Sequence, residues 1–233
     1  DNQIDIIFEH WTDNNVQLID PELESGNLVF LGVNTPASEQ AFFVDRATSE
    51  KHNITSVEDL AKPEIAMLFK DPENPEKGRL TSCISGWTCY TINLVKLKEY
   101  GLDDLYTNFD PGSGGALDAA IMAASTKNQP IVTYYWTPTS LMGKPEVDLV
   151  RLTEPAYDES CWSDMMTVVE DIKANGPEVY KPSCACEYKD MALTKLATGK
   201  FAKEQPAIID FANAYTIPTA VVNNMLAYYV DES

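Results

Sequence analysis

The chain has 233 residues, of which 44% are hydrophobic and 23% are charged, a composition typical of a globular protein with one large core or two smaller ones. Its formal net charge of −19 argues against binding to nucleic acid and against docking on anionic lipid, because both partners require a basic protein surface. The negative charge fits a protein that stays soluble at high salt, or one that binds a cationic ligand.

The sequence has no apolar segment as long as a membrane span, which needs roughly 18 residues, and no signal-peptide pattern. It opens with DNQIDIIFEHW, which reads as a strand already under way. We therefore expect that the front of a longer domain precedes Asp1.

Short apolar runs typical of strands come first in the chain, at residues 4–11, 27–33 and 40–45. A helical pattern follows at residues 55–69. It opens with a capping signature, in which Thr55 or Ser56 stands ahead of Glu58 and Asp59. Residues 70–79, KDPENPEKGR, form a polar loop rich in proline.

Helices and strands alternate through the middle of the chain. Residues 87–102 have apolar side chains at helical spacing and a stop signal at Gly101. Residues 110–127 are a glycine turn that runs into an alanine-rich helix, and residues 129–138 are a buried strand that ends on aromatic side chains and proline. Another strand is predicted at residues 147–152.

The last third of the chain is less uniform. Residues 154–190 have little regular pattern and carry three cysteines, whereas residues 190–230 read as a strand followed by helices. The alternation of strands and helices along the whole chain predicts an α/β protein with largely parallel sheets.

The five cysteines are Cys83, Cys89, Cys161, Cys184 and Cys186. A close pair that flanks one turn is typical of a disulfide in an oxidising compartment, and buried free thiols in a cytosolic protein are the alternative. Zinc is disfavoured, because the spacings are not paired Cys-x-x-Cys and the only histidines are His10 and His52.

Three of the four tryptophans, Trp11, Trp87 and Trp136, fall where a predicted strand gives way to a turn or helix. In open α/β sheets the carboxyl ends of the strands face the ligand crevice. Each ring taken singly fits core packing as well as a binding wall, but three rings in the same topological place favour a wall. Indole faces attract cations, so the pattern favours a methylated ammonium ligand, which cannot donate ordinary hydrogen bonds, held in an aromatic cage.

The segments FEHW, CISGWTC, PGSGGALDAAI and YYWTPT resemble the glycine betaine and related quaternary-ammonium substrate-binding proteins of ABC transporters, whose relatives include binders of trimethylamine N-oxide. The resemblance covers residues 4–155 and, more loosely, the tail from residue 190. It implies a type II periplasmic binding protein fold, with two α/β lobes that close on a ligand in the cleft between them. Lobe A would comprise residues 1–40 and 193–233, and lobe B residues 41–192.

The resemblance also implies a location and partners. It implies export to the periplasm and delivery of the ligand to the membrane subunits of an ABC importer, and we expect the protein to be a monomer. In this family a cage of tryptophans holds the ammonium group, and Trp11, Trp87 and Trp136 match the cage positions. Cys83 and Cys89 match the family's cysteine pair, which implies a disulfide that fixes the turn carrying Trp87.

The polar end of the ligand has two candidate partners near these tryptophans. The backbone N–H groups of Thr88 and Cys89, at a predicted helix start, match the position where such proteins bind a betaine carboxylate. Asn15, however, stands where some betaine binders have a histidine four residues after the first cage tryptophan, which disfavours a carboxylate ligand. Glu9 lies two residues before Trp11 and would point to the same side of a strand; a surface ion pair is its alternative role.

Two further residues are candidates for the cage. Glu39 is a second acid near the cleft by family position, with a structural or solvated role as the alternative. Trp162 is the candidate for a fourth wall, with a place outside the cage as the alternative. Four aromatic walls and an acid suit trimethylamine N-oxide best, choline also, and glycine betaine less.

No cofactor is expected, but the loop DPENPEKGR places Asp71, Glu73, Asn74 and Glu76 close together. Hard oxygen ligands at this density are able to hold a structural calcium ion, and a solvated loop is the alternative because the spaced Asp-x-Asp-x-Asp-Gly pattern is missing. The acids of residues 154–171 form a second candidate with less pattern.

The sequence does not favour catalysis. It has no Gly-x-Ser-x-Gly elbow and no evident nucleophile with its base, so we expect no enzyme activity. GSGG at residues 112–115 lacks the Gly-Lys-Ser/Thr ending of a phosphate cradle and is interpreted as a tight strand-to-helix turn bordering the cleft. An onium-sensing receptor domain with the same fold is the remaining alternative.

Overall fold

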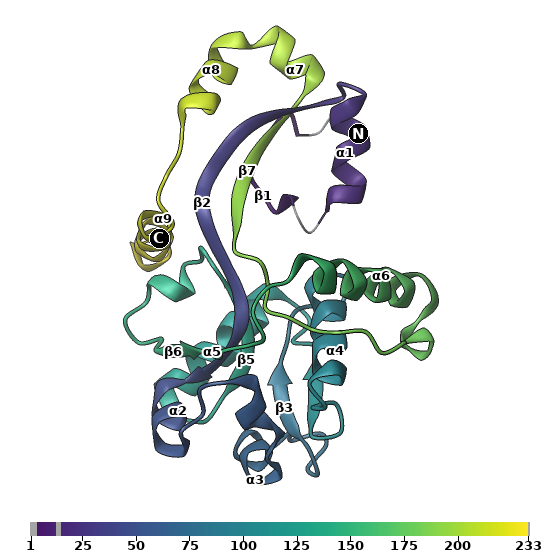
Figure 1. Cartoon of the computed structure of the whole chain (residues 1–233). Helices are drawn as coiled ribbons and strands as arrows, with labels where there is room; N and C mark the ends of the chain where they lie inside the picture. Colours follow the sequence, from purple (N-terminus) through teal and green to yellow (C-terminus); the bar gives the residue numbers. More distant parts are fainter. Residues whose placement is uncertain (1–3, 13–14, 233) are drawn as a thin grey trace. The chain divides into compact units, whose positions relative to one another are not determined.

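The computed structural model describes residues 4–12 and 15–232 (Figure 1). Its strands are β1 (Ile6–His10), β2 (Leu28–Asp45), β3 (Gly78–Thr81), β4 (Tyr106–Phe109), β5 (Val132–Thr137), β6 (Leu149–Arg151) and β7 (Met191–Thr198). Its α-helices are α1 (Val16–Glu24), α2 (Arg46–His52), α3 (Pro63–Ala66), α4 (Thr88–Glu99), α5 (Gly114–Lys127), α6 (Glu159–Asn175), α7 (Gly199–Glu204), α8 (Pro206–Ala214) and α9 (Thr219–Glu232).

The chain divides into two compact units. Unit 1 comprises Asp1–Glu39, Thr137–Gly143 and Asp190–Ser233, and unit 2 comprises Gln40–Trp136 and Lys144–Lys189. The boundaries therefore fall at 39/40 and 189/190, whereas the sequence analysis expected 40/41 and 192/193.

The segment 137–143 lies in unit 1, whereas the sequence analysis placed it in lobe B. Asn223, on α9, explains the assignment. Its side-chain oxygen accepts hydrogen bonds from the Thr137 hydroxyl (3.1 Å) and from the Thr139 backbone N–H (2.8 Å). Local sequence patterns do not predict these long-range hydrogen bonds.

Unit 1 is built on an antiparallel sheet in which β7 lies between β1 and the first part of β2. Leu31, Ala197 and Ala212 form its buried core. Lys195 of β7 is fully buried, and its ammonium group donates hydrogen bonds to the carbonyl oxygens of Ala212 (2.6 Å) and Tyr215. The amine thus satisfies carbonyl groups at the C-terminal end of α8, where a positive charge is favourable.

The long strand β2 corrects the expectation of two separate strands at 27–33 and 40–45. Its register against β7 shifts three times between Phe30 and Ser38. The two strands therefore stay paired along this irregular middle segment through β-bulges. The final residues of β2 pair with β6 in unit 2, from Phe43 to Asp45. A strand interrupted by Pro36 and polar residues has no continuous alternation, and this concealed its continuity in the sequence.

Unit 2 contains the parallel part of the sheet, in which β3 lies between β4 and β5. Phe42, Leu80, Ile92 and Val132 are among the side chains of its large buried core. Gly78 begins β3, and a Cβ atom there would lie only 2.7 Å from the Ala66 carbonyl oxygen, so this close approach of two backbones requires glycine.

The expected α/β class is correct, but the sheet is mixed rather than largely parallel. The pairs β1–β7, β2–β7 and β2–β6 are antiparallel, and β3–β4 and β3–β5 are parallel. The structure also contains the helix α6 in the segment that was expected to be irregular. Met165, Val169 and Ile172 form its buried stripe, and Asp158 caps it by accepting a hydrogen bond from the Cys161 N–H.

Capping and stop signals in the sequence predicted other elements correctly. Ser56 and Asp59 form the expected capping box, although it opens the 3-10 helix Val57–Ala61 because Pro63 interrupts a longer helix. The helix α4 ends before Gly101, which has a positive φ of 66°. Across residues 4–12 and 15–232, we find no helix with the length and apolarity required to cross a membrane.

Candidate functional site

Trp87 lies on a short turn whose two ends are joined by a disulfide. A disulfide joins Cys83, which follows β3, to Cys89 in the first turn of α4, as the family resemblance implied. Between them Gly86 adopts a positive φ of 90°, and the Trp87 N–H donates to the Ile84 carbonyl oxygen (3.0 Å). Both cysteines are buried, but the Trp87 side chain is 48% exposed. A core residue would not present this much of its ring to solvent, so the exposure favours a binding wall over core packing.

Trp136 ends the unit 2 part of β5 and contacts Trp87. The two ring centroids are 5.6 Å apart, and the planes meet edge to face at 68°. Tyr135 stacks on Trp136 with centroids 4.7 Å apart, and the Tyr135 hydroxyl is fixed by donating to Asp118 Oδ1 (2.6 Å) on α5. Trp136 is only half-buried, so the pair of indoles forms an aromatic surface on unit 2.

The GSGG segment is the turn between β4 and α5, as expected. Ser113 caps α5 by accepting a hydrogen bond from the Ala116 N–H (3.1 Å), and Gly112 has a positive φ of 82°. A Cβ atom on Gly114 would lie 4.0 Å from the edge of the Trp87 indole. The start of α5 therefore borders the Trp87 ring.

The helix α4 begins at Thr88, immediately after Trp87, and the Trp87 side chain makes no capping hydrogen bond. The N–H groups of Thr88 and Cys89 thus lie at the positive end of α4, next to the exposed indole. A helix N-terminus in this position favours a carboxylate or another small anion.

Trp162 lies on α6 and contacts the same aromatic system from another side. Ring contacts run in an unbroken series that we call the aromatic row, and it consists of Trp87, Trp136, Tyr134, Tyr188, Trp162 and Tyr157. The successive centroid distances are 5.6, 6.1, 5.7, 5.6 and 6.1 Å. The role of Trp162 as a fourth wall stays a prediction.

The sequence analysis did not identify Tyr188 and Tyr157, which belong to the aromatic row. Tyr188 is fully buried and follows the loop with Cys184 and Cys186, a stretch without helical or strand periodicity. Since its ring contacts come from residues 26 and 54 positions away, Trp162 and Tyr134, no local signal in the sequence identified it.

The first predicted cage tryptophan belongs to unit 1. Trp11 follows β1, is half-buried, and donates from its indole N–H to Glu9 Oε1 (3.2 Å). Glu9 is exposed and does lie beside Trp11, as the strand geometry predicted. The Asn15 side chain donates to the Trp11 carbonyl oxygen (3.2 Å). Glu39, on β2, is partly buried.

The remaining cysteines are paired in a way that the sequence left open. Cys161 on α6 bonds to Cys184, while Cys186 is a buried free thiol. Burial raises the pKa of the Cys186 thiol, so it is protonated at neutral pH. Its thiol lies 3.8 Å from the Asp158 carbonyl oxygen.

We expect reduction of the two disulfides to lower the melting temperature by roughly 5 °C or more. Cys83–Cys89 and Cys161–Cys184 close loops with sequence separations of 6 and 23 residues, for which loop entropy suggests roughly 2 and 3 kcal/mol of stabilisation. The measurement is a thermal melt with and without reductant, with Cys186→Ser as the control that leaves both bridges intact. An unchanged melt, with four or more thiols titratable before reduction, would contradict the pairing.

The proline-rich loop gives Asp71 a partner other than a metal. Asp71 is buried, and its Oδ1 accepts hydrogen bonds from Arg79 Nη2 (2.6 Å) and from the Glu73 N–H (2.9 Å). Burial alone would raise the Asp71 pKa, but the hydrogen bonds from Glu73 and Arg79 outweigh it and lower the pKa. Within the described residues no group of three or more His, Cys, Asp or Glu side chains is arranged to hold a metal ion, so calcium at Asp71, Glu73, Asn74 and Glu76 stays a prediction.

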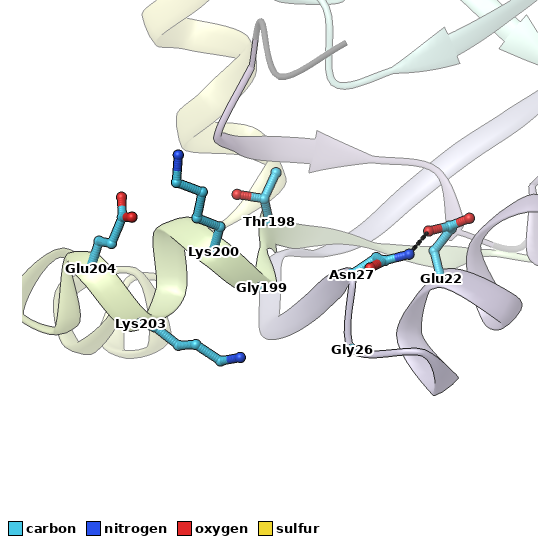
Figure 2. A pocket seen from close by; sticks show the side chains of 8 residues that line it. All are labelled: Glu22, Gly26, Asn27, Thr198, Gly199, Lys200, Lys203 and Glu204. Carbon is cyan, nitrogen blue, oxygen red and sulfur yellow. Dashed lines mark hydrogen bonds between the residues drawn. The ribbon is translucent and has the colours of Figure 1, made fainter.

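A separate pocket of about 510 Å³ lies on unit 1, between the end of α1 and the start of α7 (Figure 2). Glu22 and Glu204 contribute negative charge to its lining, and Lys200 and Lys203 contribute positive charge. Asn27 in the lining is already engaged, since it donates to Glu22 (2.9 Å). This pocket contains none of the predicted site residues.

Comparison with known proteins gives the family. The sequence matches, over residues 1–233, the family described as the substrate binding domain of ABC-type glycine betaine transport systems. The chain belongs to this family. The resemblance seen in its tryptophan and cysteine motifs is therefore confirmed, and the expectation that the chain is not an enzyme agrees with a family of binding domains.

One similar relative of this substrate-binding domain is the glycine betaine-binding periplasmic protein OusX of Dickeya dadantii (strain 3937). The two sequences are 32% identical over 126 residues, which is 53% of this chain and 37% of the relative. The match thus spans little more than a third of the length of that curated relative.

Solved structures of similar fold include lactococcal OpuAC in a closed conformation complexed with glycine betaine. It has a TM-score of 0.63 and 17% identity, and the match covers 99% of this chain and 72% of that one. An ABC-transporter choline binding protein in complex with choline has a TM-score of 0.61 and 13% identity, and the match covers 98% of this chain and 66% of that one. The substrate-binding domain thus has the fold of these binding proteins, and the predicted fold class is confirmed.

Proposed function

We propose that this chain is the ligand-binding part of an extracytoplasmic substrate-binding protein that delivers a small methylated ammonium compound to an ABC importer. The observation that carries the proposal is the half-exposed Trp87 indole, fixed by the Cys83–Cys89 bridge and in edge-to-face contact with Trp136. A ring anchored so firmly and still open to solvent is suited to contact a ligand.

Cation–π attraction provides the physical basis of this proposal. An onium group contacting several indole faces gains roughly 0.5–2 kcal/mol per ring, most when water is excluded. Micromolar binding requires about 8 kcal/mol in total, which three or four rings reach only at the upper end of this range and together with burial of the methyl groups. Trp11, Trp87, Trp136 and Trp162 are the proposed walls, and the net charge of −19 disfavours a ligand with net negative charge.

Trimethylamine N-oxide is the ligand we propose first. Glu9 accepts a hydrogen bond from the Trp11 indole N–H, which supports a carboxyl group beside one of the proposed walls. A carboxyl group in this position suits an oxide oxygen, by donating a hydrogen bond to it when protonated. Glu39 is the alternative acid for the same role.

Glycine betaine is the second candidate, because the start of α4 favours it. Thr88 and Cys89 present their N–H groups at this helix start, where a betaine carboxylate would bind. The names of the similar proteins support betaine and choline as ligand classes, since they include a glycine betaine-binding periplasmic protein and a choline binding protein. An onium-sensing receptor domain is a further alternative with the same site.

The proposed location is the periplasm, and the proposed partners are the membrane subunits of the importer. The periplasmic name of the Dickeya relative and the two disulfides support an oxidising compartment outside the cytoplasm. The proposed state in solution is a monomer.

Calorimetric titration tests the proposal with four compounds: trimethylamine N-oxide, choline, glycine betaine and a sulfonium analogue. Binding of trimethylamine N-oxide in the micromolar range or tighter, with weaker binding of the other three, is the expected result. Preference for glycine betaine would move the polar contact to the α4 amides and overturn the N-oxide assignment. No binding of any of the four would overturn the proposed function.

A further inference from the structure

A buried ammonium group, that of Lys96, contacts one ring of the aromatic row. The Lys96 ammonium group on α4 is fully buried and lies 2.6 Å from Glu154 Oε2, whose side chain is also buried. The same nitrogen lies over the Tyr188 ring, 4.1 Å from its centroid, and is 5.5 Å from the centroid of Phe42. A buried cation over a ring face is held by the electrostatic attraction of the ring, which is stronger without water.

Tyr188 connects this charge to the tryptophans. Its ring contacts Trp162 on one side, at 5.6 Å, and Tyr134 on the other, at 5.7 Å. Tyr134 in turn contacts Trp136, with centroids 6.1 Å apart. Tyr188 and Tyr134 thus lie between two of the proposed ligand walls, and Tyr188 is buried too deeply to contact solvent.

Two groups of α4 fix the orientation of Tyr188. Lys96 lies over its ring face, and Asn93, one turn earlier on the same helix, accepts a hydrogen bond from its hydroxyl group (2.7 Å). The Asn93 side chain is itself fixed, because its amide donates to Ser82 Oγ (3.0 Å). With a face contact and a hydroxyl contact, the Tyr188 ring has a defined position and tilt.

A disulfide also holds the segment that carries Tyr188. Cys184, four residues before Tyr188, is joined to Cys161, which precedes Trp162 on α6. The segment with Tyr188 and the helix with Trp162 are therefore linked to each other, and α4 holds the segment through Lys96. Because Trp87 is the N-cap of α4, the helix that starts at one proposed wall also fixes Tyr188, which contacts Trp162 directly and Trp136 through Tyr134.

We propose that Lys96 and Tyr188 are positioning residues of the ligand site, which hold Trp136 and Trp162 in their binding orientation. This inference rests on the proposed function and names residues that do not touch the ligand. Removal of the Tyr188 ring leaves space beside Trp162 and beside Tyr134, the ring that contacts Trp136, and both proposed walls then lose their fixed geometry.

The test compares three variants of the protein. Tyr188→Leu removes the ring, and Tyr188→Phe keeps the ring and the Lys96 contact but loses the bond to Asn93. Tyr106→Leu is the matched control, because Tyr106 is equally buried in the same core and makes no ring contact with the aromatic row in the described part of the chain. Each variant is measured for its melting temperature and, below it, for calorimetric affinity for trimethylamine N-oxide, choline and glycine betaine.

We expect Tyr188→Leu to weaken the tightest of these affinities at least about tenfold, and Tyr188→Phe to change it by less than about threefold. The control Tyr106→Leu lowers the melting temperature comparably and leaves the affinity within about twofold. Unchanged affinity in folded Tyr188→Leu would show that Tyr188 is only a core residue and would overturn the proposal.

The contribution of Lys96 is tested with both charges removed. The double variant Lys96→Met with Glu154→Leu replaces the buried pair by apolar side chains, which buried ion pairs often tolerate without loss of folding. We expect it to fold and to bind its ligand at least about threefold more weakly, because the Tyr188 ring has lost its cation. Wild-type affinity would exclude Lys96 as a positioning residue.

Near-ultraviolet circular dichroism separates failure of this inference from failure of the proposed function. The signal of packed aromatic rings depends on their fixed mutual orientation and needs no ligand. If none of the three compounds binds the unaltered protein, loss of this signal in Tyr188→Leu and its retention in Tyr106→Leu would still support the positioning role. Equal spectra of the two variants would overturn it.

Discussion

Replacing Trp87 by alanine is expected to weaken ligand binding at least about tenfold. The ring is 48% exposed and anchored by a disulfide beside it, so its removal takes away a proposed wall without opening a large cavity in the core. We therefore expect the melting temperature of Trp87→Ala to change little. Calorimetry and a thermal melt on the same sample measure both effects.

The control for this change is Tyr229→Ala. Tyr229, on α9 in unit 1, is 71% exposed, so the substitution removes another exposed aromatic ring at no predicted cost in affinity. Retained affinity in Trp87→Ala would show that the indole only packs against Trp136. A large loss of stability without loss of affinity would lead to the same conclusion.

Replacing Lys96 alone by methionine is expected to lower the free energy of unfolding by about 3–5 kcal/mol, the largest stability effect predicted for a single substitution. The reason is the carboxylate that remains. Glu154 is buried, one of its oxygens has no hydrogen-bond partner among the described side chains and backbone, and the other accepts from Lys96 and Tyr100. Without Lys96 an uncompensated charge stays in the core.

Lys98→Met is the matched control, because Lys98 lies on the same helix and pairs with Asp103 at the surface (3.1 Å). Both side chains of that pair are partly exposed, so its loss is expected to cost no more than about 1 kcal/mol. Chemical denaturation of the two variants measures the difference. Similar small losses for both would mean that Glu154 finds another partner or a proton, and that the buried pair does not hold the core.

The sequence predicted most elements whose signals are local. The helix after Trp87, the turn before α5 and the strand with Trp136 near its end follow from periodicity, glycine and capping residues. The antiparallel pairing in unit 1 was missed, because it joins β7 to strands more than 150 residues earlier and leaves no local pattern. The same applies to the place of residues 137–143, which depends on Asn223.

The candidate site was predictable in part. Trp87 and Trp136 were identified because each falls where a predicted strand gives way to a turn or helix, and the structure brings them into contact. Glu9 was placed beside Trp11 by the alternation of side chains in a strand, which the hydrogen bond between them confirms. The partner of Cys161 and the central position of Tyr188 depend on tertiary packing of an irregular segment, so residue spacing carried no information on them.

The central claim is that aromatic walls recognise the positive charge of a methylated ligand rather than its shape alone. The most direct test is calorimetric titration of the protein with the tightest-binding of the onium compounds and with its uncharged carbon isostere, which for trimethylamine N-oxide is tert-butanol. Cation–π recognition predicts that the isostere binds at least about tenfold more weakly. Equal affinities for the two compounds, or no binding of any onium compound, would contradict the claim.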